Sequence, residues 1–278
     1  MNWKSFAGRL WTRINDHDIF GGAAKLSYYF LLALFPLLLM LMSLLGYFAE
    51  SGSELRLKLI TYLGTVMPSS AITLVHNTLD EISEARGGAK LSIGLLAALW
   101  AASNGMGAIS DTLNAAYGVK EQRSWWKVRL VSILLTMALS VLIILALVIV
   151  LYGGNIGESI AGHFGFGAAF TTAWKIVQWP IALFFMIVTF NIIYYFGPAG
   201  RPRKRRWCMV GTLTAVVLWL LVSFAFRVYL HFFNSYSVTY GSLGALIILM
   251  LWFYFTGLAI LLGGEINSEL QDAELSHK

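Results

Sequence analysis

The sequence predicts an all-α polytopic membrane protein with six transmembrane helices. Only 12% of its 278 residues are charged and 58% are hydrophobic, whereas soluble domains carry about twice that share of charge. The mean hydropathy is +0.71. The chain also contains several apolar runs of about 20 residues, the length of helix that crosses a hydrocarbon layer of roughly 30 Å. We therefore treat residues 1–278 as a single integral membrane domain.

The first 25 residues are amphipathic. Trp3, Leu10 and Ile14 recur at helical spacing, while Lys4 and Arg9 lie off that stripe. This pattern is typical of a helix that lies in the membrane interface. A basic flank that only sets the orientation of the chain is the alternative.

The first predicted span covers residues 26–48 and contains Pro36. Residues 53–86 after it are too polar for the bilayer core but are patterned. Ile72, Val75 and Leu79 share one helical face, as an amphipathic helix requires. We expect an extracytoplasmic helical hairpin between spans one and two.

The second predicted span, 91–113, is rich in small residues, including Gly94, Ala98 and Ala102. Small residues let helix backbones approach closely, so this helix is expected to be central. Its polar residues Ser103 and Asn104 need partners at that depth.

Four further spans are predicted at 130–152, 173–196, 207–230 and 243–264. The span at 130–152 is the most uniformly apolar and is expected to face lipid. A Gly-rich loop at 153–172 and a short loop at 231–242 are expected between spans.

Lys and Arg are in excess in three regions, the amino terminus, 115–129 and 197–206, whereas the four basic residues of 49–90 are offset by five acidic ones. The 153–175 region has only Lys175, and 231–241 has none. The positive-inside rule then places both termini and the two basic loops in the cytoplasm, as an even number of spans allows.

Four groups of residues carry a resemblance to a known family. They are Ala24-x3-Tyr28-Tyr29-x5-Phe35-Pro36; Ser103-x-Gly105-x2-Ala108-Ile109-x4-Asn114-x2-Tyr117; Tyr194-Tyr195-x2-Pro198; and Tyr240-Gly241-Ser242-Leu243-Gly244 with Leu251-Trp252-x-Tyr254 and Leu262-Gly263-Gly264-Glu265-x-Asn267. In this order they resemble the YihY/BrkB family of bacterial inner-membrane proteins, once labelled ribonuclease BN. Gly264 stands where Ala is expected. The resemblance implies a six-helix fold in the inner membrane, with links to envelope lipids and virulence, and a ribonuclease name regarded as a misassignment.

The residues give no support to hydrolysis. The five histidines, including His17, lie in separate segments without an HxH or HxxxH pair, and Asp16-His17-Asp18 is interpreted as a solvated turn. Cys208 is the only cysteine, which excludes an internal disulfide. The basic cluster at 201–206 is explained by topology, so nucleic acid is not an expected partner. We predict no enzyme activity, cofactor or metal.

Two sets of residues are candidates for function. Candidates for a polar interior or substrate path, or for interhelical contacts and an aromatic belt, are Ser103, Asn104, Asn191, Tyr28, Tyr195 and Tyr240. Candidates for headgroup or ion-pair sites are Arg227, Asp111, Arg129, Glu265 and Lys25. Glu265 is expected to pair with Lys25 or Arg129, and Arg227 to anchor the outer interface or bind a headgroup.

The function predicted from these features is transport-type handling of an envelope lipid or another amphiphile, with membrane lipids as partners. A non-catalytic scaffold that docks envelope proteins through residues 53–86 is the alternative, and a solute or ion channel is a third. A GxxxxGK[ST] loop is absent from the sequence, so the chain does not bind ATP in that way.

Overall fold

A computed structural model describes residues 3–48, 61, 89–164, 168–200, 205–232 and 236–276. Within these ranges every regular element is a helix. The helices are α1 (Trp3–Asp16), α2 (Ile19–Phe48), α5 (Ala89–Ala116), α6 (Trp125–Phe164), α7 (Ala168–Phe196), α8 (Arg205–Phe232) and α9 (Tyr236–Ser276). The expected hairpin at 53–86 lies outside the described residues.

Four helices are long and apolar enough to cross a membrane. Their apolar segments are Trp125–Val150 in α6, Phe170–Phe196 in α7, Cys208–Tyr229 in α8 and Leu246–Glu274 in α9. The remaining long helices, α2 and α5, have 30 and 28 residues, and α2 continues through Pro36. The chain is therefore an all-α membrane protein.

The two loops expected on the far side of the bundle are much shorter than predicted. α6 runs to Phe164 and α7 begins at Ala168, while α8 ends at Phe232 and α9 begins at Tyr236. Gly153 in α6 faces α7, where its carbonyl oxygen accepts a 2.5 Å hydrogen bond from Nε1 of Trp174. Part of the predicted Gly-rich loop is thus helical, and Gly153 and Gly157 lie where a Cβ would meet side chains of α7.

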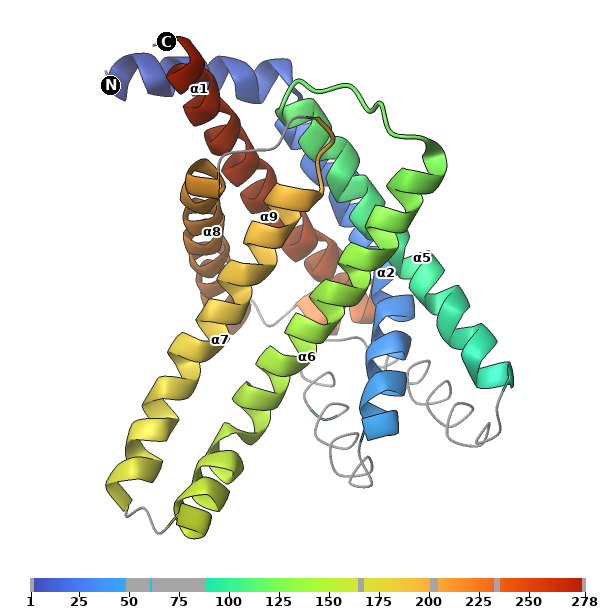
Figure 1. Ribbon diagram of the computed structural model, residues 1–278, viewed down its shortest axis with the longest axis vertical. Helices are drawn as coiled ribbons and strands as arrows, with labels where there is room; N and C mark the ends of the chain where they lie inside the picture. The colour runs from blue at the N-terminus through green and yellow to red at the C-terminus, as the bar shows by residue number, and fades with distance from the viewer. Residues whose placement is uncertain are drawn as a thin grey trace.

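α9 is the central helix of the bundle. It packs against α1, α2, α5 and α8, whereas α7 contacts chiefly α6 and α8. A third (33%) of the apolar segment of α9 is buried, compared with 11% of that of α7. Figure 1 shows α9 crossing the bundle between α8 and α2. Among the four apolar segments, the one with the largest buried share thus carries the candidate residue Glu265.

Small residues set the closest helix contacts. A Cβ on Gly257 of α9 would lie 3.1 Å from Cβ of Leu26 in α2, and one on Gly105 of α5 would lie 3.1 Å from Cβ of Ala33. The same α2 helix therefore approaches both α9 and α5 across glycine. Close approach of this kind is how membrane helices gain packing energy when lipid tails are as apolar as the side chains.

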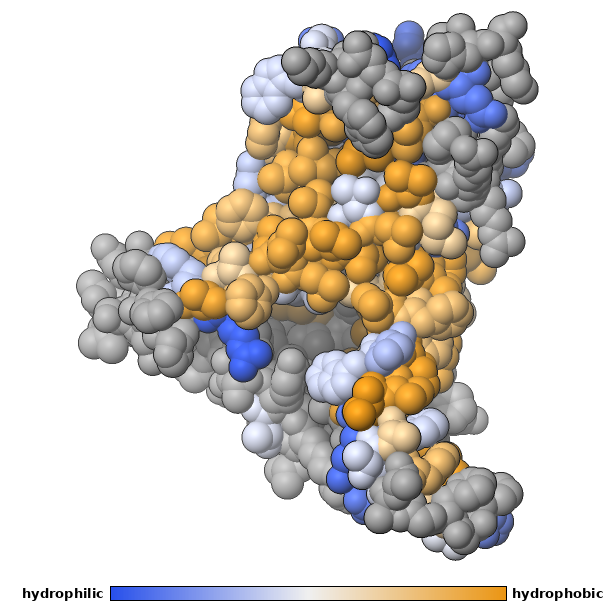
Figure 2. All heavy atoms as spheres, turned by 90° about the vertical axis from the view of Figure 1, so that its left-hand side faces the viewer, coloured by the Kyte–Doolittle hydropathy of each residue, from blue (hydrophilic) through white to orange (hydrophobic). Residues whose placement is uncertain are grey.

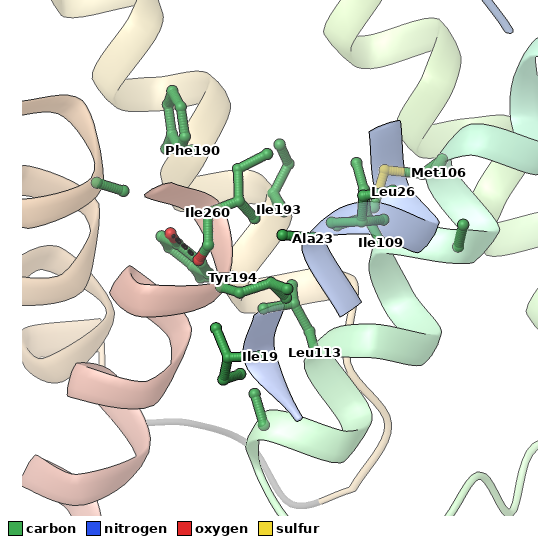
Figure 3. Packing of buried hydrophobic residues seen from close by; sticks show 14 of the residues in the cluster. Ile19, Ala23, Leu26, Met106, Ile109, Leu113, Phe190, Ile193, Tyr194 and Ile260 are labelled. Carbon is green, nitrogen blue, oxygen red and sulfur yellow. Dashed lines mark hydrogen bonds between the residues drawn. The ribbon is translucent and has the colours of Figure 1, made fainter. Parts of the chain in front are cut away.

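The core lies where α2, α5, α7, α8 and α9 meet. Figure 3 shows its apolar side chains from several helices pointing toward one another around Tyr194. The hydroxyl of Tyr194 donates a 2.7 Å hydrogen bond to the carbonyl oxygen of Ile260. The outer surface is also apolar: Figure 2 shows a largely hydrophobic face. Among the exposed large side chains are Trp179, Phe184 and Phe224. A surface of this composition suits a bilayer.

Helix α1, the last turns of α9, the α5–α6 loop and the described residues after α7 lie at the same end of the bundle. Both ends of the chain are at the top of Figure 1, where α1 lies across the end of α9. Val119 in the α5–α6 loop, Gly200 after α7 and Asp272 in α9 line one pocket at this end. We call this end of the molecule the loop end.

Candidate functional site

A carboxylate is completely buried where α1 meets α9. The side chain of Glu265 has no solvent exposure. Its Oε2 accepts a 3.1 Å hydrogen bond from Nε of Arg13, and its Oε1 lies 2.6 Å from Nδ1 of His17. A buried charge is tolerated only when it is paired and hydrogen-bonded, and both partners here come from the amino-terminal segment.

Further ion pairs extend outward from Glu265 along the two helices. Nη1 of Arg13 donates a 2.7 Å hydrogen bond to Asp272, and Nε of Arg9 lies 2.5 Å from Oε1 of Glu269. Residues 265, 269 and 272 follow a spacing of four and three, which places them on one face of α9. Arg9 and Arg13 are one turn apart on α1. We name the set Arg9, Arg13, His17, Glu265, Glu269 and Asp272 the α1–α9 ion-pair network.

Apolar contacts hold α1 in this position. Phe6 and Ile14 are buried, and Ile14 belongs to the main core. A sharp turn then leads into α2: Asp18 has a positive φ of 46°, and its Oδ1 accepts a 3.2 Å hydrogen bond from the backbone N–H of Gly21. Asp18 therefore caps α2, and the turn brings His17 over the end of α9.

Arg13 is the centre of the network. Besides its carboxylate partners, its Nη2 donates to the hydroxyl of Ser268 and, at 3.3 Å, to the carbonyl oxygen of Ala116. Burial, the largest influence, by itself lowers the pKa of Arg13, but hydrogen bonds to Asp272 and Glu265 raise it, with a net rise above the ordinary value. Arg13 is thus a permanent cation that joins α1, α5 and α9.

A second cavity, lined by both polar and apolar residues, adjoins the network. It has a volume of about 280 Å³, and its lining includes His17, Asp18, Lys25 and Asp111. The candidates Lys25 and Asp111 are therefore brought together here, by α2 and α5. We call it the α2–α5 pocket.

Glu265 has different partners from those expected. Arg13 and His17 replace the expected Lys25 or Arg129, because α1 folds back across the end of α9. The prediction that Asp16-His17-Asp18 is a plain solvated turn is also wrong for His17, whose ring contacts Glu265. Sequence reasoning missed Arg13, His17, Glu269 and Asp272 as members of the site.

The expected polar residues of α5 and α7 lie apart from this network. Ser103 is fully buried and donates a 2.7 Å hydrogen bond to the carbonyl oxygen of Trp100. Asn104 is exposed and accepts a 2.7 Å hydrogen bond from Nη1 of Arg129, whose guanidinium carbon lies 3.8 Å from the centre of the Trp100 ring. Asn191 in α7 is half-buried, and its Nδ2 has no hydrogen-bond partner among the described residues.

The other candidates lie on the surface. Tyr28 and Tyr195 are exposed by 54% and 39%, and Arg227 is exposed near the end of α8. The side chain of Tyr240 lies outside the described residues. Among the described residues, no group of three or more His, Cys, Asp or Glu side chains is arranged to hold a metal ion.

Comparison with known proteins decides the family. The family described as virulence factor BrkB matches residues 10–278. The chain belongs to the BrkB family. A relative in Bacillus subtilis strain 168, named ribonuclease-like protein YfkH, is 38% identical over 266 residues, covering 96% of this chain and 95% of the relative.

More distant BrkB-like relatives are longer than this chain. A UPF0761 membrane protein of Xanthomonas oryzae pv. oryzae strain PXO99A is 28% identical over 274 residues, and the chain spans 60% of its length. A UPF0761 membrane protein of Xanthomonas campestris pv. campestris strain B100 is 27% identical over 274 residues and is also covered to 60%. No solved structure matches the chain.

Several of the residues that carry the BrkB resemblance lie at the loop end. Tyr194, Glu265 and Asn267 are all buried there, and Asn267 Oδ1 accepts a 2.7 Å hydrogen bond from the backbone N–H of Gly211. Asn114 joins two loops: its Oδ1 accepts a 2.6 Å hydrogen bond from the backbone N–H of Ala199. These residues of the BrkB pattern thus belong to a packed polar layer. The α1–α9 ion-pair network adjoins this layer and shares Glu265 with it.

Proposed function

We propose that this BrkB-family protein is a transport-type protein of the bacterial inner membrane that handles an envelope lipid or another amphiphile. We further propose six spans, formed by α2, α5, α6, α7, α8 and α9, with both termini in the cytoplasm. The lengths of α2 and α5 support the two spans beyond the four apolar segments, since 28 residues of helix extend about 42 Å.

Charge distribution supports the orientation. Lys4, Arg9 and Arg13 in α1 and Lys120 and Arg123 in the α5–α6 loop belong to elements that meet at the loop end. Basic residues close to span ends are retained on the cytoplasmic side of a membrane. The loop end is thus proposed to face the cytoplasm.

The observation that carries the proposal is the burial of Glu265. The 29 residues from Tyr236 to Gly264 contain no charge, and Glu265 then pairs with Arg13 of α1 and contacts His17 in the turn after it. An ionisable residue in such a helix is a functional hypothesis by default. Because α1 is a separate helix whose charged side chains pair with α9, we propose that it acts as a latch that closes the cytoplasmic end of an amphiphile path.

The proposal is tested by lipid movement in liposomes that contain the purified full chain. Headgroup-labelled lipids of several charges would be followed by accessibility to a membrane-impermeant quencher. Glu265→Gln would be compared with Glu158→Gln, which makes the same chemical change at an exposed side chain in α6 (64% exposed). We expect the wild type to move at least one lipid faster than empty liposomes do, Glu265→Gln to change that rate severalfold, and Glu158→Gln to leave it unchanged.

The outcomes separate the hypotheses. Folded wild-type protein that moves no lipid of any charge would refute lipid transport and favour a non-catalytic membrane scaffold, for which residues 53–86 stay the predicted docking segment. Lipid movement that is equal in Glu265→Gln and Glu158→Gln would keep the transport function but refute the latch.

A further inference from the structure

A second pocket at the loop end lies beside the ion-pair network and shares Asp272 with it. Its volume is about 510 Å³. Three parts of the chain form it: the α5–α6 loop, the residues after α7, and the last turns of α9. We call it the loop pocket.

The loop pocket is shaped by internal bonds of the protein. Asn114 links its two loops, because its Oδ1 accepts from the Ala199 N–H at 2.6 Å and its Nδ2 donates to Glu121 at 3.1 Å. Gly200, on the rim, has a φ of +100°, and a Cβ there would lie 3.0 Å from a Val119 methyl group. The site is therefore pre-formed, as small-molecule sites usually are.

The charges around the loop pocket leave one cation unmatched by the described contacts. Arg123 is matched by Glu121, to which its Nε and Nη2 donate at 2.9 and 2.7 Å. Asp272 is matched by Arg13 at 2.7 Å. Lys120 lines the pocket and makes no ion pair among the described residues. Lys120 thus adds a cation that no described ion pair offsets, next to the fixed guanidinium of Arg123.

The loop pocket lies at the depth of lipid headgroups. Gln122 and Arg123 line it, and Trp125 and Trp126, at the start of α6, are 59% and 72% exposed. Exposed Trp residues at the end of a span mark the membrane–water interface. Basic pockets at this level on the cytoplasmic side bind phosphate-containing headgroups in other membrane proteins.

We propose that the loop pocket binds a phosphate-bearing anion. Lys120 supplies the unmatched charge, Arg123 presents its guanidinium in a fixed orientation, and the side-chain amides of Gln122 and Gln271 supply further donors. The phosphate can belong to an anionic phospholipid of the inner leaflet or to a soluble phosphate ester. The site does not depend on lipid movement, and it would bind its ligand even if the latch proposal failed.

The test is ligand retention by the detergent-solubilised full chain, measured by native mass spectrometry. The lipid probe is phosphatidylglycerol, and the soluble probe is glycerol phosphate, added alone and as a competitor. Lys120→Ala removes the exposed side chain that carries the unmatched charge, and Lys120→Arg restores a cation at the same position. Lys127→Ala is the control, because this exposed lysine of α6 does not line the pocket.

We expect Lys120→Ala to weaken binding of a phosphate probe about tenfold, the effect of one charge-assisted hydrogen bond. Lys127→Ala should remain within about twofold of the wild type, and Lys120→Arg should recover most of the loss. If Lys120→Ala loses phosphatidylglycerol and glycerol phosphate does not displace this lipid from the wild type, the ligand is a lipid. If glycerol phosphate displaces the lipid, the ligand is a soluble ester. The same affinity in wild type, Lys120→Ala and Lys127→Ala for both probes, or no binding of either, would overturn the proposal.

Discussion

The backbone N–H of Gly211 in α8 donates a 2.7 Å hydrogen bond to Oδ1 of Asn267 in α9, with both residues buried. This contact is possible because Gly263 lies opposite Gly211, so that the two helix backbones approach without side chains between them. The polar layer of the loop end is thus built directly on a glycine contact between membrane helices.

Substitution of Gly211 by Ala should destabilise the protein. A Cβ at this position would overlap the carbonyl oxygen of Gly263 and the amide of Asn267, and overpacking of this kind costs typically about 1–3 kcal/mol. Thermal unfolding in detergent should therefore occur at a lower temperature. Gly154→Ala is the control, because a Cβ there meets no heavy atom within 4 Å. A melting temperature for Gly211→Ala as high as that of the control would contradict the packing described here.

Arg13→Ala should be much more damaging than Arg9→Ala. Removal of Arg13 takes a cation from the buried Glu265, and loss of one partner of a buried pair costs about 3–5 kcal/mol. Arg9 is 49% exposed, and its buried partner Glu269 keeps a second cation, Arg13, within 3.5 Å, so the loss of Arg9 should cost about 1 kcal/mol or less. The measurement is a double-mutant cycle of unfolding with Glu265→Gln. Additive effects of Arg13→Ala and Glu265→Gln would show that the two side chains do not interact.

Tyr194→Phe should destabilise the core by about 1 kcal/mol, the usual contribution of one buried hydrogen bond. Its hydroxyl donates to Ile260 at 2.7 Å in α9, and the side chain is fully buried. Tyr195→Phe is a matched control at the next position, where the side chain is exposed. Unfolding of the two variants at the same temperature would argue against the contact between α7 and α9.

Acid should weaken the α5–α6 loop only at very low pH. The Arg123 side-chain hydrogen bond is the largest cause that lowers the pKa of Glu121 from 4.5 to about 2. A lowered carboxylate pKa means that the stabilisation is complete above pH 4.5 and is lost as the pH falls toward 2. The difference in melting temperature between wild type and Glu121→Gln should thus be constant from pH 7 to 5 and shrink below pH 4. A difference that disappears near pH 6 would show that a group other than Glu121 causes the pH dependence.

Composition and hydropathy were enough to predict an all-helical membrane protein and the approximate places of its apolar segments. The helix ends were predicted less well. Glycine was interpreted as a helix breaker at 153–172, although Gly153 lies inside α6 because its partner helix packs there. Helix propensity depends on neighbours in the sequence, whereas Gly153 makes its contact with another helix. The sequence does not show which helix that is.

The sequence predicted some residues of the candidate site but not their partners. Glu265, Lys25 and Asp111 were selected because charge at a span end is conspicuous. The partners of Glu265 were not selected, because Arg13 and Glu265 are 252 residues apart and no local pattern links them. A usable signal was present in two stripes: carboxylates at 265, 269 and 272, and basic side chains at 9, 13 and 17. Matching spacing of opposite charge on two helices indicates that they pair.

The position of α1 also determines when the molecule can be completed. Arg9 binds Glu269, 260 residues later in the chain, and synthesis at about 5–20 residues per second delays that partner by at least ten seconds or so. Until then the cations of α1 have no carboxylates from α9 to meet. A nascent chain that stops before its last span therefore carries an undocked basic helix, which distinguishes an incomplete product from a finished one during membrane insertion.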